Sequence, residues 1–141
     1  MTEIDYGLRA RIGAIIPSVN VAAESEFSGL APNGVRFHTT RLKLAGSTEK
    51  ELLGMADDVE PAARLLNDAG VGLVIFHCTA VTTFAKGFDD KILARVKDAT
   101  GLAATATSKA ILAALEALGV RKVALLTPYI PATNAREVAF L

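Results

Sequence analysis

The sequence predicts an α/β protein built on a parallel sheet. Short apolar runs, typical of strands buried on both faces, alternate with longer amphipathic stretches that carry helix-capping residues. This alternation gives parallel strands joined by helical crossovers. A length of 141 residues with 51% hydrophobic side chains is enough for a real hydrophobic core and is too apolar for a disordered chain.

Strands are expected where a short apolar run is bounded by turn residues. The first run ends at Pro17, the second partly alternates between apolar and polar side chains and suits a more exposed strand, and the third is the clearest buried strand. The expected strands are residues 11–17, 35–44, 71–76, 102–105 and 122–127.

Helices are expected where apolar residues recur at helical spacing between a capping residue and a glycine. Thr48 and Glu51 have capping-box spacing, so a helix begins at Thr48, and Pro61 kinks or restarts it because proline lacks a backbone donor. A short early helix contains Glu24 and Glu26. The later helices are expected at 48–70, 89–100, 108–118 and 131–141, with Gly70, Gly101 and Gly119 as stop residues.

Composition excludes several classes of protein. A net charge of +0 argues against a nucleic-acid binder, and one cysteine excludes a disulfide scaffold or a cysteine-cluster zinc site. Two distant histidines argue against a histidine metal site. No apolar run reaches membrane-spanning length and no signal-peptide pattern is present, so we expect a cytoplasmic protein without a membrane partner.

Three strand ends carry polar or reactive side chains, and ligands bind beyond the carboxyl ends of strands in open parallel sheets. Residues 17–20 read Pro-Ser-Val-Asn, which lacks the glycines of a dinucleotide-binding turn but suits a small anion. Cys78 follows the third strand, and Tyr129 follows the last. No nucleotide-binding pattern occurs, so we expect no nucleotide.

Cys78 and Tyr129 each allow two interpretations. A thiolate at Cys78 would be a nucleophile beside a carboxylate held by backbone N–H groups and the Thr79 hydroxyl. Alternatively, Cys78 is a small buried apolar residue. Tyr129 would be a donor or general acid in the same cleft, or it would cap the sheet edge.

The other ionisable residues are expected to be structural. Strand alternation directs His77 to the side opposite Cys78, and His38 is expected at the surface. Glu24 and Glu26 are two residues apart, so they are expected on different faces of a helix. The pairs Asp57–Asp58 and Asp89–Asp90 are expected to be solvated or to cap helices.

Taken in order, these motifs resemble one family. Residues 11–20, Arg-Ile-Gly-Ala-Ile-Ile-Pro-Ser-Val-Asn, resemble the opening of maleate cis–trans isomerases and arylmalonate decarboxylases, which belong to the Asp/Glu/hydantoin racemase superfamily. Cys78-Thr79 resembles the family's first catalytic-cysteine motif. Residues 99–129 are similar to the segment joining its two lobes.

The resemblance implies two pseudo-symmetric, three-layer α/β lobes with the active site between them and no cofactor. Residues 1–119 would form the first lobe and residues 120–141 the start of the second. The family's second cysteine lies in the second lobe, so we expect a homo-oligomer in which another copy completes the site. The expected ligand is a small carboxylate.

The resemblance also implies roles for individual residues. Cys78 would be the nucleophile, and Thr79 and Tyr129 would bind a carboxylate and stabilise an enediolate. The remaining positions implied for the substrate pocket are Pro17, Ser18, Asn20, which would contact a substrate carboxylate, and Ala80, where related enzymes often carry serine.

The activity implied is cofactor-independent isomerisation of a small dicarboxylic acid such as maleate. One alternative is a decarboxylase, although the family's decarboxylases carry glycine at the position of Cys78. Another is a racemase, which would need two opposed thiols. A third alternative, from a different class, is a non-catalytic module that binds small acids.

Overall fold

A four-stranded parallel sheet with strand order β2-β1-β3-β4 forms the centre of the structure. The computed structural model describes residues 4–46 and 48–141. β1 pairs with β2 over its whole length and with β3 over four residues, and β3 pairs with β4. The strands are β1 (Ala10–Pro17), β2 (Val35–Leu42), β3 (Leu73–Phe76) and β4 (Ala103–Ala106). The expected parallel α/β sheet is therefore confirmed.

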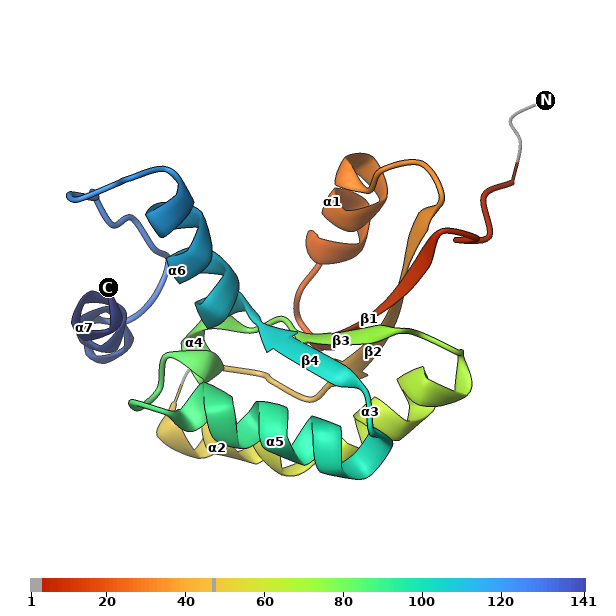
Figure 1. The fold of residues 1–141 in the computed structure, drawn as a ribbon. Helices are drawn as coiled ribbons and strands as arrows, with labels where there is room; N and C mark the ends of the chain where they lie inside the picture. The colour runs from red at the N-terminus through yellow and green to blue at the C-terminus, as the bar shows by residue number, and fades with distance from the viewer. Residues whose placement is uncertain (1–3, 47) are drawn as a thin grey trace.

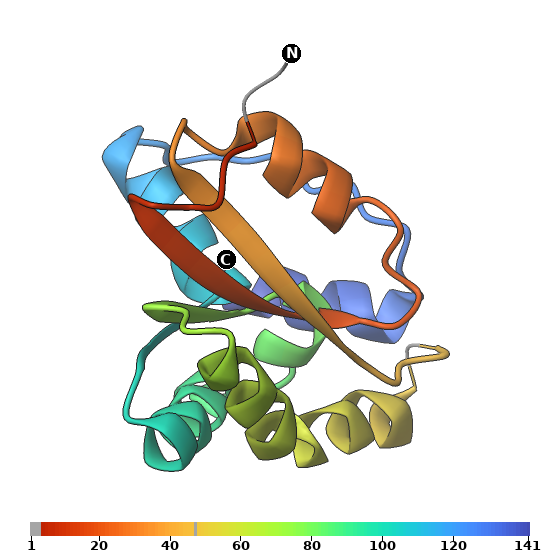
Figure 2. The same cartoon turned by 90° about the vertical axis from the view of Figure 1, so that its right-hand side faces the viewer.

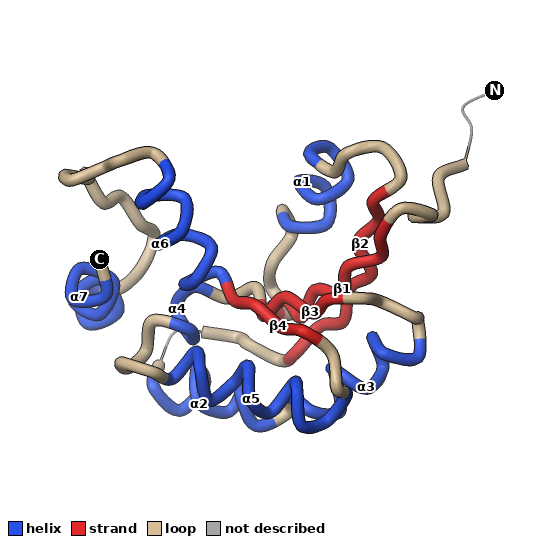
Figure 3. Tube along the Cα trace, viewed as in Figure 1, coloured by secondary structure: helices blue, strands red, loops and turns tan. Residues whose placement is uncertain are grey.

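Helices cover both faces of the sheet and make three layers (Figure 1). One face carries α2 (Glu49–Asp57), α3 (Val59–Asp68) and α5 (Phe88–Thr100), and the other carries α1 (Ala23–Leu30). The short α4 (Thr79–Thr82) follows β3. Beyond β4, α6 (Thr107–Ala117) and α7 (Pro131–Phe140) extend away from the sheet, as the tube trace in Figure 3 also shows.

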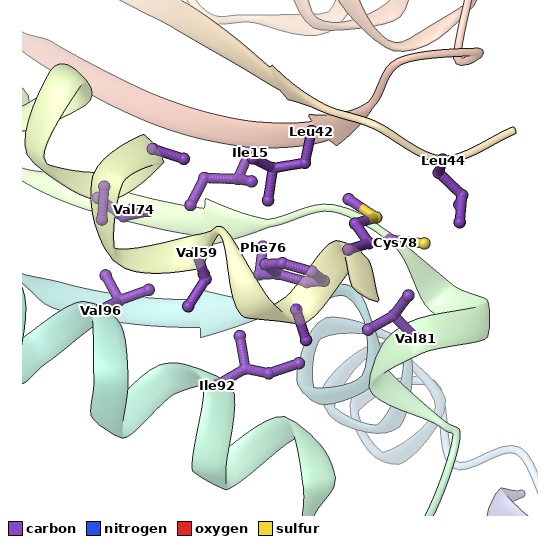
Figure 4. Packing of buried hydrophobic residues seen from close by; sticks show 14 of the residues in the cluster. Ile15, Leu42, Leu44, Val59, Val74, Phe76, Cys78, Val81, Ile92 and Val96 are labelled. Carbon is purple, nitrogen blue, oxygen red and sulfur yellow. The ribbon is translucent and has the colours of Figure 1, made fainter. Parts of the chain in front are cut away.

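The main core lies between the sheet and the helical layer of α2, α3 and α5. Phe76, Val74 and Ile15 project into it from the strands and meet Val59 and Ile92 of the helices (Figure 4). A smaller cluster of Ala14, Ile16 and Ala23 lies under α1, extended by the stacked rings of Phe27 and Phe37 at 4.4 Å between centroids. Figure 2 shows α1 packed along this second face. Alternate residues of β1 thus fill different cores.

The long helix expected around Pro61 is two helices that meet at Asp58. Pro61 has no N–H to bond the carbonyl of Asp57, so the helix breaks there and restarts. Arg95 of α5 occupies the break: its guanidinium donates to the carbonyl of Ala56 at 2.7 Å, to that of Asp57 at 2.9 Å, and to the Glu60 carboxylate. A side chain from another helix therefore bonds the carbonyls at the break.

The expected helix ends are confirmed. Thr48 and Glu51 form the complete capping box at the start of α2. Gly70, Gly101 and Gly119 all have φ between 64° and 73°, the left-handed conformation that glycine adopts without strain after a helix.

Two expectations about the strands were wrong. Residues 122–127 form no strand, and residues 122–126 are exposed, because the described sheet ends at β4 and no neighbouring strand pairs with them. His38 is half-buried on β2 rather than at the surface, and its Nε2 has no hydrogen-bond partner within the described residues. No helix in residues 4–46 and 48–141 is long and apolar enough to cross a membrane.

Candidate active site

The candidate site lies where the chain leaves β1 and β3 in opposite directions. From β1 the chain passes to α1 on one face, whereas from β3 it passes through α4 to α5 on the other face. The His77 N–H donates to the Ile15 carbonyl at 2.8 Å, so the β1–β3 pairing continues one residue past β3. The turn at residues 18–20 and Cys78 therefore emerge at the same sheet edge, at the switch point where ligands bind in such sheets.

Cys78 is at the N-cap position of α4 and is only 8% exposed. Its carbonyl accepts hydrogen bonds from the N–H and the hydroxyl of Thr82, both at 3.0 Å. Its side chain packs in the main core near Val81 and Leu44 (Figure 4). The backbone is thus fixed, and the thiol lies at the border between the core and the sheet edge.

The pKa of Cys78 is raised to about 11: burial is the largest cause and the charge of Glu137 adds to it, while hydrogen bonds from the N–H groups of Val81 and Ala80 oppose the rise. Hydrogen bonds from these two N–H groups favour the thiolate, but the loss of hydration on burial outweighs them. At neutral pH the resting side chain is therefore the thiol.

Tyr129 is half-buried and packs against the core cluster that contains Cys78. Its N–H donates to the Thr127 hydroxyl at 3.1 Å, the Thr127 hydroxyl donates to the Asn134 side-chain oxygen, and the Asn134 amide donates to the Tyr129 carbonyl at 3.3 Å. These bonds hold the backbone of Tyr129 against α7. Burial, and next the charge of Cys78, raise the pKa of the Tyr129 phenol, so it remains a hydrogen-bond donor at neutral pH.

Asn20 lies two residues before Ala22, the N-cap of α1. Its Oδ1 accepts hydrogen bonds from the N–H of Ala22 at 3.0 Å and from the N–H of Ala23 at 2.9 Å. Because these bonds occupy the oxygen, the remaining polar group of the side chain is the amide Nδ2, which can only donate. This chemistry suits a carboxylate ligand.

Ser18 and Pro17 serve the fold of this edge. The Ser18 Oγ accepts from the Leu44 N–H at 3.0 Å and donates to the Leu44 carbonyl at 3.3 Å, so it ties down the segment after β2. Pro17 is buried at the end of β1, where it pairs with Leu42. The structure brings both residues to the sheet edge but commits the Ser18 hydroxyl to the backbone.

Thr79 and Ala80 form the first turn of α4. Thr79 is half-buried, and its carbonyl accepts the N–H and the hydroxyl of Thr83, both at 2.9 Å. Ala80 is buried. The chain thus places Cys78, Thr79 and Ala80 in one rigid turn.

Sequence reasoning missed Glu137. This carboxylate on α7 is only 4% exposed and lies 2.9 Å from the hydroxyl of Thr83, which is also buried and shares its one proton between Glu137 and the Thr79 carbonyl. Its charge raises the pKa of both Cys78 and Tyr129. The available sequence signal was weak: Thr133 and Glu137 are one helical turn apart, and both turn out to be buried on α7.

Asp89 also differs from expectation. It is buried rather than solvated, and it accepts a hydrogen bond from the buried Ser108 hydroxyl at 2.8 Å and pairs with Lys109 at 3.4 Å. These contacts lock the start of α5 to the start of α6. By contrast, Asp57, Asp58 and Asp90 are exposed, as expected.

His77 has the structural role expected of it. Its ring meets Phe27 of α1 edge-on at 5.1 Å between centroids, so it lies on the face opposite the main core. Its Nδ1 is 3.4 Å from the Thr107 hydroxyl. Burial lowers the pKa of His77, and the charge of Glu26 partly offsets this.

Two hollows in the surface adjoin the elements of this edge. One of about 540 Å³ is bordered by α4, α5, α6 and α7, including Lys86 and Arg136, and one of about 650 Å³ lies beside the segment 43–51. None of the expected site residues lines either hollow. Across residues 4–46 and 48–141, no three His, Cys, Asp or Glu residues are grouped so as to hold a metal ion.

Comparisons with known proteins agree with this architecture. The arylmalonate decarboxylase family model matches residues 12–141. Arylmalonate decarboxylase of Bordetella bronchiseptica is 33% identical over 92% of this chain and 54% of its own length. Maleate isomerase of Geobacillus stearothermophilus is 30% identical over 88% of this chain and 55% of its own length.

A solved structure has the same fold. It is a cysteine-to-serine mutant of the Nocardia farcinica maleate cis–trans isomerase with a covalently bound succinylcysteine intermediate. It superposes with a TM-score of 0.81 at 25% identity, over 92% of this chain and 57% of that one. The chain thus spans about half the length of the relatives it matches. With the family model covering nearly the whole sequence, the chain belongs to the arylmalonate decarboxylase family, which here groups it with decarboxylases and maleate isomerases.

Proposed function

We propose that this chain supplies the nucleophile and carboxylate-binding donors of a cofactor-independent isomerase that acts on small cis-dicarboxylic acids such as maleate. The observation that carries the proposal is that a thiol and an amide donor lie at the same edge of the sheet. There the lone thiol of Cys78 follows β3, and the turn after β1 presents the Asn20 amide as a fixed donor. A thiol beside a carboxylate-binding amide is what addition to an unsaturated diacid requires.

The proposed reaction has two steps. The Cys78 thiolate adds to one alkene carbon, a C–S bond forms, and the π electron pair moves onto the adjacent carboxylate to give an enediolate. Thr79, Tyr129 and backbone N–H groups stabilise that charge. Rotation about the new single bond and return of the electron pair expel the thiolate and give fumarate, with no net redox change.

A covalent step of this kind has support in a relative. The succinylcysteine in the Nocardia farcinica enzyme is a cysteine bonded to a four-carbon diacid. Cys78 is the one cysteine in this sequence, so it is the residue that would form such a bond here. Roles for Asn20, Pro17, Ser18, Thr79, Ala80 and Tyr129 in binding the substrate form part of the same proposal.

Protonation of the resting thiol sets a clear kinetic expectation. Only the thiolate adds to the alkene, and the pKa of Cys78 is about 11. Isomerisation should therefore rise about tenfold per pH unit below that pKa, in proportion to the thiolate fraction.

The test is incubation of the folded protein with maleate while proton NMR follows the appearance of fumarate. Turnover that disappears in Cys78→Ala and rises with pH supports the isomerase. A folded wild type that makes no fumarate at any pH, with its thiol intact, overturns the activity for this chain and favours a non-catalytic module that binds small acids. Maleate-induced shifts of the Asn20 amide resonance would identify that module.

A decarboxylase is the second candidate, and the raised pKa of Cys78 favours it. A thiol that stays protonated at neutral pH suits a proton donor to an enediolate left by loss of CO₂. The two candidates differ in pH dependence: decarboxylation of an arylmalonate by a Cys78 thiol should be flat up to high pH and fall above it. Racemase chemistry would need a second thiol opposite Cys78.

We also propose that a second copy of the chain covers the apolar surface after α6. Leu118, at the end of α6, is 76% exposed, and Leu126, in the segment that was expected to be a strand, is 94% exposed. Exposed apolar side chains in this number mark an interaction surface. Light scattering after size exclusion should show a dimer or larger assembly, and a strictly monomeric protein at micromolar concentration would overturn this assembly.

A further inference from the structure

We propose that Arg41 is a positioning residue that fixes the Asn20 amide at the sheet edge. Arg41 is the next-to-last residue of β2, opposite Ile16 of β1. Its Nη1 donates to the carbonyls of Ser18 at 3.0 Å and of Asn20 at 2.8 Å. The identity of the ligand that Asn20 would bind rests on the proposed function, but the positioning contacts do not.

A second set of contacts anchors the guanidinium itself. The Arg41 Nη2 donates to Glu24 Oε2 at 2.6 Å, and the Thr39 hydroxyl donates to Glu24 Oε1 at 2.7 Å. The Thr39 hydrogen bond and then the Arg41 contact lower the pKa of Glu24, so it stays a carboxylate near neutral pH. Glu24 is therefore a permanent partner for Arg41.

These contacts form a closed ring. Arg41 holds the carbonyl of Asn20, Asn20 holds the N–H groups of Ala22 and Ala23 through Oδ1, and Glu24 in the first turn of α1 returns to Arg41. A turn held at both ends fixes the direction of the free Asn20 Nδ2. A donor ordered before the ligand arrives avoids the entropy cost of ordering it on binding.

The ring requires arginine. The planar guanidinium serves two carbonyls and one carboxylate at once, whereas a lysine ammonium is a compact point charge without that fork. The Arg41 side chain is also 37% exposed, and exposed ion pairs contribute little to stability. Arg41→Lys should therefore disturb the turn without unfolding the protein.

Arg36 provides a matched control on the same strand. It pairs with Asp5 at 3.1 Å, its side chain is 40% exposed, and it lies at the opposite end of β2 from the turn. We expect Arg41→Lys to speed amide hydrogen exchange at Ala22 and Ala23, and Arg36→Lys to leave it unchanged. Maleate affinity, measured by NMR titration, should fall roughly two- to tenfold in Arg41→Lys alone, the cost of ordering one further side chain.

A double mutant separates positioning from general destabilisation. If Arg41 acts through Asn20, Arg41→Lys should weaken maleate binding in the wild type but add nothing in an Asn20→Ala background. Unchanged exchange in Arg41→Lys, or additive losses of affinity, would overturn the positioning role. If the wild type binds no maleate, the proposed function fails, and the exchange comparison alone decides whether Arg41 fixes the turn.

Discussion

Thr83 at the end of α4 and Glu137 on α7 share a buried hydrogen bond of 2.9 Å, although they are 54 positions apart in the sequence. The bond connects two halves of the candidate site. α4 carries the N–H groups that face the Cys78 sulfur, and α7 carries Asn134, which holds the Tyr129 backbone. The Glu137 carboxylate thus joins α7 to α4 and also raises the pKa of the Cys78 thiol.

Replacing Glu137 by glutamine should lower the pKa of Cys78. The change removes the charge that opposes the thiolate but keeps an oxygen that can accept from Thr83. The pKa should stay above its ordinary value of 9.0, because burial is the larger cause of the shift. The measurement is the rate of iodoacetamide alkylation against pH, with Glu116→Gln on the exposed face of α6 as control. An unchanged or higher pKa would contradict this electrostatic role.

Cys78 should make the protein less stable in alkali. The folded state raises its pKa from 9.0 to about 11, so the folded protein holds the proton more tightly than the unfolded chain. The resulting stabilisation, up to roughly 2–3 kcal/mol, is complete below pH 9 and is lost as the pH rises from about 9 to 11. Urea unfolding of wild type and Cys78→Ala should give free energies that converge over this range. Parallel curves would show that the thiol titrates normally.

Two substitutions at Asn20 should separate its structural and binding roles. Asn20→Ala removes the acceptor for the N–H groups of Ala22 and Ala23 and should cost about 1 kcal/mol of stability. Asn20→Asp keeps an acceptor at the start of α1, so stability should be maintained, but it replaces the donor with a negative charge. Maleate affinity should fall in both, and it should stay measurable in Asn20→Ala, where only one donor is missing. Retained binding in Asn20→Asp would exclude Asn20 as a carboxylate ligand.

Ser108→Ala should destabilise the fold without touching the sheet edge. It removes the hydroxyl donor to the buried Asp89 carboxylate, and leaving such a group short of a partner costs about 1–3 kcal/mol. Ser25→Ala, on the exposed surface of α1, should change stability by less than about 0.5 kcal/mol. Thermal and urea unfolding provide the comparison. Equal stabilities of the two variants would show that Lys109 alone satisfies Asp89.

The features determined by the sequence itself are those carried by neighbouring residues. The capping box of Thr48 and Glu51, the break before Pro61 and the left-handed Gly101 depend on groups within one helical turn, so the printed residues suffice to predict them. Strands β1 to β4 follow from apolar runs in the same way. The motifs at the strand ends are also short and contiguous, so the family could be identified from the sequence without knowledge of the tertiary contacts.

The tertiary structure decided what those patterns leave open. Residues 122–127 have the composition of a buried strand, yet no described strand lies beside them to share backbone hydrogen bonds. Glu137 and Asp89 look like surface carboxylates in the sequence but are buried because Thr83 and Ser108, from other elements, supply their donors. The protonation of Cys78 depends on burial and on a charge from α7. Solvation and pairing depend on residues that are distant in the chain, and only folding brings those residues together.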